Sequence, residues 1–178
     1  MLPDELNAAV GSLLSAQRGT NVSINEVRSV GGGCINEACM LKTSVGNYFL
    51  KYNSATSFPA MFEKEAAGLK ILSDTQTITV PRVIQHSQAG KYAFLLLQYI
   101  ENGNAGGNFW NEFGTKLADL HRNTNTYFGL DHDNYIGSLV QKNNPHPDFT
   151  SFFILQRLEP QLRSEERRVG KECRSRWS

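Results

Sequence analysis

The chain has 178 residues, of which 40% are hydrophobic and 20% charged, a composition typical of a folded globular protein. Residues 1–10 hold two acidic residues and no basic one, which excludes a secretory signal peptide. The longest apolar run lies within residues 92–100 and is far too short to cross a bilayer, so we expect no membrane partner. We expect a cytoplasmic location because the chain has too few cysteines for a disulfide framework.

Residues 163–178, RSEERRVGKECRSRWS, are rich in arginine and have no apolar period. This string resembles the in-frame translation of a sequencing adapter, so we expect a non-native tail; a genuine basic tail is the alternative. Without its six basic and three acidic residues, the chain keeps 12 basic and 14 acidic residues. No basic excess then remains to favour a nucleic-acid partner. Cys34 and Cys39 remain, which are too few for a disulfide framework.

Along the chain, apolar residues at helical spacing predict a first helix over residues 4–17. Residues 23–30, 34–44 and 47–53 then read as strands. The Gly46–Asn47 pair between two alternating runs favours a hairpin. This order puts the glycines of residues 31–33 between the first two strands of an antiparallel meander.

The clearest helix covers residues 57–72, with Ser57 as its predicted cap and Pro59 in its first turn. Its apolar stripe is formed by Phe62, Leu69 and Leu72. Two more strands are predicted over residues 79–87 and 92–100. The second is apolar through its middle, as expected of a strand that is covered on both faces.

The polar, glycine-rich residues 101–108 are predicted to be a linker. A helix over residues 108–123 follows. Residues 126–148 show no regular period and are expected to form a long ordered loop. A last helix is predicted to start at residue 149.

Glu65 belongs to the buried stripe of its helix, where a carboxylate is costly unless a cation meets it. Lys51 is the predicted cation, because strand alternation puts it on the same face as Phe49 and opposite to Leu50 and Tyr52. A glycine-rich turn, a strand lysine, a helix glutamate and an apolar strand ending in a linker follow the order of a kinase nucleotide lobe. The alternatives are a plain turn, a surface lysine and a solvated glutamate.

The chemistry of phosphate binding accounts for this order of elements. Glycine lets backbone N–H groups approach phosphate oxygens closely, and a lysine held by a glutamate supplies a point charge. Adenine would then bond the backbone where the apolar strand meets the linker, at Gln98, Tyr99 and Ile100. The glycine segment alone is a weak motif, because Asn36 stands where a G-x-G-x-x-G loop has its last glycine.

Seven segments in order resemble the fructosamine kinase (ketosamine-3-kinase) family, which is kin to aminoglycoside and choline phosphotransferases. They are GGGCINEA, YFLKYN, FEKEAAGLKIL, VPRVI, LADLHR, FGLDHDNYIGS and RLEPQL. The resemblance implies an α+β fold: a kinase-like N-lobe, with an antiparallel sheet and one packed helix, over residues 1–100. Residues 101–162 would be the linker and the start of a truncated, helical C-lobe. It also implies ATP and Mg²⁺ as cofactors and phosphate transfer to a sugar hydroxyl of small-molecule or protein-bound ketosamines, which promotes deglycation.

Carried over by position, the resemblance assigns site residues in this sequence. The implied ATP-binding residues are Gly31, Gly32, Gly33, Cys34, Ile35, Asn36, Lys51, Glu65, Gln98, Tyr99 and Ile100. The residues implied to lie near the sugar are Asn134, Tyr135, Ile136 and Gly137.

One departure is large. The family's catalytic aspartate, in a His-Gly-Asp segment, and its metal ligands would lie beyond Leu162, and this sequence contains no such segment. We therefore expect this chain to be inactive and to lack metal ligands, and a longer parent to be an active kinase. An aminoglycoside- or choline-type phosphotransferase and a non-catalytic nucleotide-binding module are the alternatives.

Cys34 lies in the glycine segment next to the predicted anion site, where positive charge would lower its pKa and favour oxidation. Some members of the resembled family carry a cysteine there and are thought to be redox-sensitive. Two interpretations stay open: a redox switch or redox-linked homodimer through Cys34, and an inert small residue. Cys39, on a strand, is expected to be buried and inert.

Overall fold

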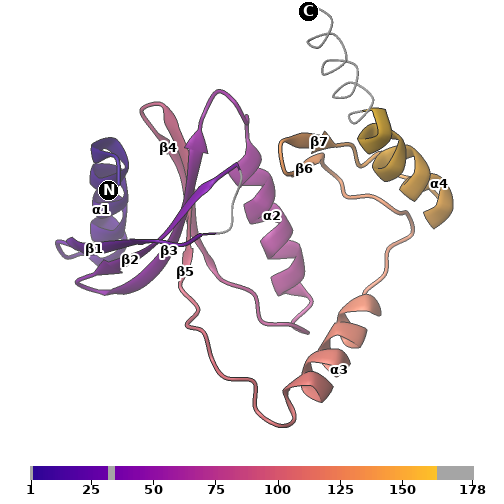
Figure 1. The fold of residues 1–178 in the computed structure, drawn as a ribbon, viewed down its shortest axis with the longest axis horizontal. Coiled ribbons are helices and arrows are strands. Elements are labelled where there is room, and N and C mark those ends of the chain that lie inside the picture. Colours follow the sequence, from indigo (N-terminus) through magenta and orange to yellow (C-terminus); the bar gives the residue numbers. More distant parts are fainter. Residues whose placement is uncertain (1, 32–34, 164–178) are drawn as a thin grey trace, which may run out of the picture. The chain divides into compact units, whose positions relative to one another are not determined.

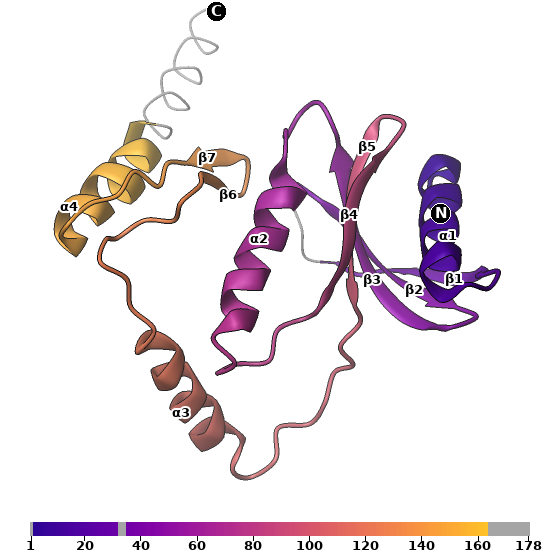
Figure 2. The ribbon, with the colours of Figure 1, turned by 180° about the vertical axis from the view of Figure 1, so that it is seen from behind.

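The computed structural model describes residues 2–31 and 35–163. The chain divides into two compact units, Met1–Asn123 and the residues from Thr124 onward, and each is described by itself. The first unit is built on a five-stranded antiparallel sheet (Figures 1 and 2). Its elements are α1 (Asp4–Arg18), β1 (Ile24–Ser29), β2 (Glu37–Thr43), β3 (Gly46–Ser54), α2 (Met61–Asp74), β4 (Val83–Ala89), β5 (Tyr92–Gln98) and α3 (Phe109–His121).

The strands lie in the order β1-β2-β3-β5-β4, which confirms the predicted meander of the first three. The backbone N–H of Val30 donates to the carbonyl of Ala38 at 2.9 Å, so the two ends of the glycine-rich segment are held together. At the β2–β3 hairpin, Gly46 has a φ of 128°, a conformation that favours glycine. The Thr43 hydroxyl donates to the Gly46 carbonyl at 2.7 Å and fixes this turn.

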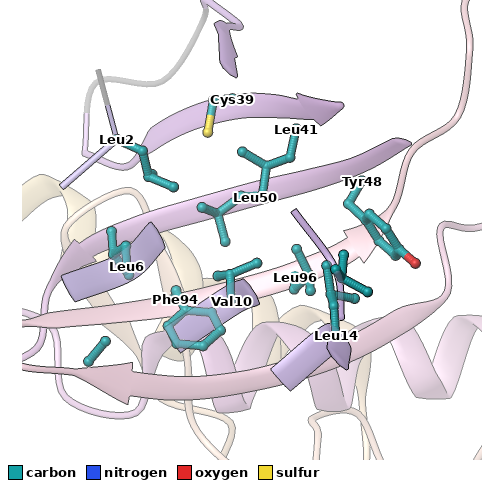
Figure 3. Packing of buried hydrophobic residues seen from close by; sticks show 12 residues of the cluster. Leu2, Leu6, Val10, Leu14, Cys39, Leu41, Tyr48, Leu50, Phe94 and Leu96 are labelled. Carbon is teal, nitrogen blue, oxygen red and sulfur yellow. The ribbon is translucent and has the colours of Figure 1, made fainter. Parts of the chain in front are cut away.

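Helix α1 covers one face of the sheet (Figures 1 and 2). Its fully buried residues Leu6, Val10 and Leu14 recur at helical spacing and pack against the sheet. Figure 3 shows these side chains meeting Leu50 and Leu96. The first helix predicted from the sequence is thereby confirmed, and the structure adds that it packs on the sheet.

Helix α2 covers the opposite face, where Phe62 and Ala66 pack with Leu95 and Leu97 of β5. Neighbouring β5 residues point to opposite faces, and Leu96 joins the α1 cluster instead. The apolar run of β5 is therefore buried on both sides, as predicted. The sequence predicted one packed helix on this sheet, and the structure has two.

The start of α2 differs from the prediction. The helix begins at Met61 after Ala60, which has a φ of 56°, and no side chain caps it. Ser57 is not the cap: its backbone N–H and hydroxyl both donate to the Ser54 hydroxyl, at 3.3 and 3.1 Å. Pro59 precedes the first turn. The turn after β3 uses these residues, so the helix starts later than the capping pattern suggested.

At the other end of α2, the predicted stripe does not hold to its last member. Leu69 packs against the α2 cluster, but Leu72 is 37% exposed. The helix predicted over residues 108–123 is confirmed by α3, and residues 99–106 before it have no regular structure. No residue of α3 is buried, and Phe109, Trp110 and Phe113 form a contacting aromatic group on its surface.

The second unit corrects the expectation that residues 126–148 form a loop without regular secondary structure. Residues 126–148 contain a two-stranded hairpin, β6 (Asn134–Ile136) with β7 (Leu139–Gln141). Gly137 at its turn has a φ of 59°. The Gly137–Ser138 pair between short apolar runs was the available signal for this hairpin.

The predicted last helix is confirmed. Asp148 caps α4 (Phe149–Phe153) by accepting the Ser151 N–H at 2.8 Å, and this bond lowers the pKa of its carboxyl. A π-helical turn follows over Ile154–Leu158. Among the residues described, no helix has both the length and the apolar character needed to cross a membrane.

Candidate functional site

Lys51 of β3 and Glu65 of α2 form an ion pair across the sheet–helix layer. The Lys51 ammonium lies 2.7 Å from Oε1 and 2.8 Å from Oε2 of the Glu65 carboxylate. The two side chains are 23% and 31% exposed, so the pair is shielded by the protein yet reachable from solvent. The predicted pairing is confirmed.

The positions of both partners follow from the local sequence. Phe49, two residues before Lys51, packs into the α2 cluster, whereas Leu50 and Tyr52 belong to the α1 cluster. Strand alternation thus directs Lys51 toward α2. Glu65 lies three residues after the buried Phe62 on the helix face that meets the sheet.

Asn53 extends this site, and the sequence analysis did not identify it. Its Nδ2 donates to Oδ1 of Asn36 at 2.8 Å and lies 3.3 Å from Sδ of Met61. Asn53 is 6% exposed. The available signal was its place two residues after Lys51, which puts a polar side chain on the same inward face.

The glycine-rich segment is described at both of its ends. Gly31 is exposed, and Ile35 and Asn36 are half-buried. Of the other residues predicted there, Gly32, Gly33 and Cys34 lie outside the described residues. The hydrogen bond of Asn36 to Asn53 brings the end of this segment to the strand that carries Lys51.

The predicted adenine site lies at the end of β5. The backbone N–H of Gln98 donates to the Arg82 carbonyl at 2.8 Å, so this group is already used within the sheet. Tyr99 is half-buried and Ile100 is 48% exposed. A ligand at this edge would therefore have to use backbone groups other than the Gln98 N–H.

The predicted sugar-proximal residues Asn134, Tyr135, Ile136 and Gly137 all belong to the β6–β7 hairpin of the second unit. Asn143, 3% exposed, holds this hairpin by donating from Nδ2 to the His132 carbonyl at 2.8 Å and to Asn134 Oδ1 at 3.2 Å.

Arg157, from the π-helical turn, supports the same hairpin. Its Nη2 donates to Oδ1 of Asn143 at 2.5 Å, and its guanidinium stacks 4.5 Å from the centre of the Phe152 ring. Burial lowers the pKa of Arg157. The sequence analysis identified neither Asn143 nor Arg157, since the hydrogen bonds given above join residues 9 to 14 positions apart along the chain.

Cys39 is buried in the α1 cluster, as predicted, with 4% of its surface exposed. Burial raises the pKa of its thiol to about 11. A protonated, enclosed thiol is a poor nucleophile, so this cysteine takes no part in the site.

The described site suits an anion better than a metal ion. A lysine ammonium, fixed by both oxygens of one carboxylate and still partly exposed, can contact a phosphate group. Residues 2–31 and 35–163 contain no group of three or more His, Cys, Asp or Glu side chains that could hold a metal ion. These residues therefore fit a nucleotide phosphate but not a resident Mg²⁺.

Sequence similarity relates this chain to one family of kinases. A family model described as fructosamine kinase matches residues 6–176, a range that ends within the segment expected to be non-native. A probable ketoamine kinase of Synechocystis is 37% identical over 162 residues, which cover 90% of this chain and 55% of the relative. A chloroplastic protein-ribulosamine 3-kinase of Arabidopsis thaliana is 37% identical over 158 residues, with 85% and 47% covered. The chain spans about half the length of the curated relatives it matches.

Two solved structures resemble this chain in fold. A putative fructosamine-3-kinase from Haemophilus somnus superposes with a TM-score of 0.76 at 28% identity, covering 83% of this chain and 50% of the other. One from Thermobifida fusca superposes with a TM-score of 0.75 at 24% identity, covering 90% and 55%. At that identity the second match supports the fold alone.

Proposed function

The chain belongs to the fructosamine kinase family, and on this premise we propose that it is the nucleotide-binding part of an ATP-dependent ketosamine kinase. The observation that carries the proposal is the Lys51–Glu65 ion pair, a fixed cation on the inner strand of a kinase-like sheet. The reaction would transfer the γ-phosphate of ATP to a sugar hydroxyl of a fructosamine or ribulosamine, and so promote removal of the adduct.

In this proposal, the ammonium of Lys51 binds the phosphates of ATP, and Glu65 fixes where it lies. The segment from Gly31 to Asn36 supplies backbone N–H groups to the same phosphates. Adenine bonds the backbone at Gln98, Tyr99 and Ile100 through groups other than the Gln98 N–H, which the sheet already uses.

Binding of the sugar that accepts the phosphate is assigned to the second unit. Residues 134–137 would lie near the sugar, on a hairpin that Asn143 and Arg157 hold in shape. The name ribulosamine 3-kinase, printed for one relative, supports a ketosamine as acceptor. The catalytic aspartate and the ligands of Mg²⁺ would be supplied by a longer protein, because this chain contains no His-Gly-Asp segment.

The proposal is tested by comparing two proteins for phosphate transfer to a free ketosamine and to a glycated protein, with the product followed by phosphorus NMR. One is this chain, and the other is a longer protein whose reading frame continues beyond Leu162. We expect transfer by the longer protein alone, and loss of it in its Lys51→Ala variant. Turnover by this chain would contradict the expected inactivity. Transfer to an aminoglycoside or choline, and not to ketosamines, would replace the proposed substrate.

Two further predictions from the sequence belong to the same proposal, namely a redox-linked homodimer through Cys34 and a cytoplasmic location. Cys34 lies outside the described residues, so the dimer rests on the sequence argument. Diamide should produce a dimer that is reversed by dithiothreitol and absent from the Cys34→Ala variant. Persistence of the dimer in that variant would refute the assignment.

A further inference from the structure

Asn53 is a buried polar residue that faces the nucleotide site from β3. Its Nδ2 lies between two acceptors, Oδ1 of Asn36 at 2.8 Å and Sδ of Met61 at 3.3 Å. Because both neighbours accept hydrogen bonds, the NH₂ end of the amide is the end that faces them. The carbonyl end of Asn53 therefore points away from this contact.

That carbonyl oxygen is in an unusual position. Oδ1 of Asn53 is buried and meets no donor within the described part of the chain. A buried acceptor without a partner destabilises a fold, whereas an apolar side chain of similar size does not carry this penalty. Rules of this kind are broken mainly at functional sites, which suggests that Asn53 is kept for a reason other than stability.

Asn53 and Lys51 both join β3 to α2. The two residues are neighbours on one face of β3, and their partners Met61 and Glu65 are neighbours on one face of α2. Two adjacent contacts thus align the start of α2 with β3. Asn53 adds a third segment by binding Asn36, the last residue of the glycine-rich stretch.

We infer that Asn53 is a positioning residue for nucleotide phosphates: it holds Asn36 and the first turn of α2 in register with the Lys51–Glu65 pair. This inference rests on the proposed function. Asn53 does not itself touch the ligand, and its effect reaches the phosphates through Asn36 and Lys51.

The test is calorimetric titration of ATP into this chain and its variants, with thermal unfolding measured on the same samples. Asn53→Leu removes both the hydrogen bonds and the unpartnered oxygen, and Asn53→Ala serves if the leucine variant does not fold. The effect of Lys51→Ala on ATP binding tests the proposed function separately. Thr43→Val is the matched control, since Thr43 is 7% exposed and bonds the β2–β3 turn at the opposite end of β2 from Asn36.

We expect Asn53→Leu to raise the Kd for ATP about fivefold or more, the loss of roughly one hydrogen bond. The Tm should stay within about 3 °C of the parent, because the lost bonds are offset by removal of the buried oxygen. Thr43→Val should lower the Tm and leave the Kd unchanged. The double variant with Asn36→Ala should bind as weakly as Asn53→Leu alone, because both substitutions break one contact.

Two results would overturn the inference, and they are distinguishable. If Lys51→Ala weakens ATP binding but the Asn53 variants change the Kd by less than about twofold, the role of Asn53 is refuted and the proposed function stands. If Lys51→Ala leaves ATP binding unchanged, the proposed function fails, and the inference that rests on it fails as well.

Discussion

The Lys51 ammonium contacts both oxygens of the Glu65 carboxylate, at 2.7 and 2.8 Å, and so joins the central strand β3 to helix α2. Both side chains are partly exposed, so the pair is neither an ordinary surface contact nor a fully buried one. A carboxylate that uses both oxygens on one cation fixes the cation's position, and Asn53 lies two residues further along the same strand.

Replacing Glu65 with Gln should weaken ATP binding to this chain about tenfold, because a neutral amide holds the ammonium less firmly than a carboxylate does. Stability should fall by only about 1 kcal/mol, since the pair is partly solvated. Calorimetric titration and urea unfolding measure the two effects. Glu63→Gln, on the exposed side of the same helix, is the control and should leave ATP binding unchanged. Equal effects of the two substitutions would contradict the role of Glu65.

The buried middle of β5 should dominate the stability of the first unit. Leu96 is fully buried in the α1 cluster, so Leu96→Ala should lower the free energy of unfolding by about 2–5 kcal/mol. The exposed Ile71 is the control, and Ile71→Ala should cost less than about 0.5 kcal/mol. Urea unfolding followed by circular dichroism measures both values. A similar cost for the two would show that α1 does not pack as described.

Cys39 should make stability depend on alkaline pH. The pKa of its thiol is raised by burial to about 11, so the folded state keeps a proton that the unfolded chain loses near pH 9. Its contribution is fully present below pH 9 and is lost as pH rises through about 11, up to roughly 2–3 kcal/mol.

The measurement is urea unfolding of the parent and of Cys39→Ala at several pH values from about 8 to 11. Lysines and tyrosines titrate in this range in both proteins, so the difference between the two isolates Cys39. We expect the parent to lose stability more steeply than the variant. Parallel pH profiles would show that the thiol is not protected in the folded state.

Gly129 should be intolerant of a side chain. Its φ of 121° disfavours other residues, and a Cβ there would lie 2.7 Å from the backbone oxygen of Asn143. Gly129→Ala should therefore destabilise the second unit by about 2 kcal/mol or more. Hydrogen exchange should show faster loss of protection at Phe128 and His146, whose backbones exchange two hydrogen bonds. Gly103→Ala, which would meet nothing within 4 Å, should leave exchange unchanged.

The local periodicity of apolar residues in the sequence determined where most helices and strands lie and which way their side chains point. A period of two put Lys51 on the α2 side of β3, and a helical period put Glu65 on the inward face of α2. The unbroken apolar middle of β5 predicted a strand covered on both faces. The meander and the positions of four helices followed from the same patterns and from turn residues. Each of these features depends on residues a few positions apart, which is the range over which backbone geometry fixes side-chain direction.

Tertiary structure alone decided the contacts between distant segments. The sequence showed neither that Asn53 binds Asn36 and Met61, nor that α2 begins after the turn at Ser54, nor that Asn143 and Arg157 organise the β6–β7 hairpin. The physical reason is that an asparagine, a serine or an arginine has many available partners of similar energy. Which one it bonds is fixed only when the turns and the packing of the fold bring a particular partner within reach.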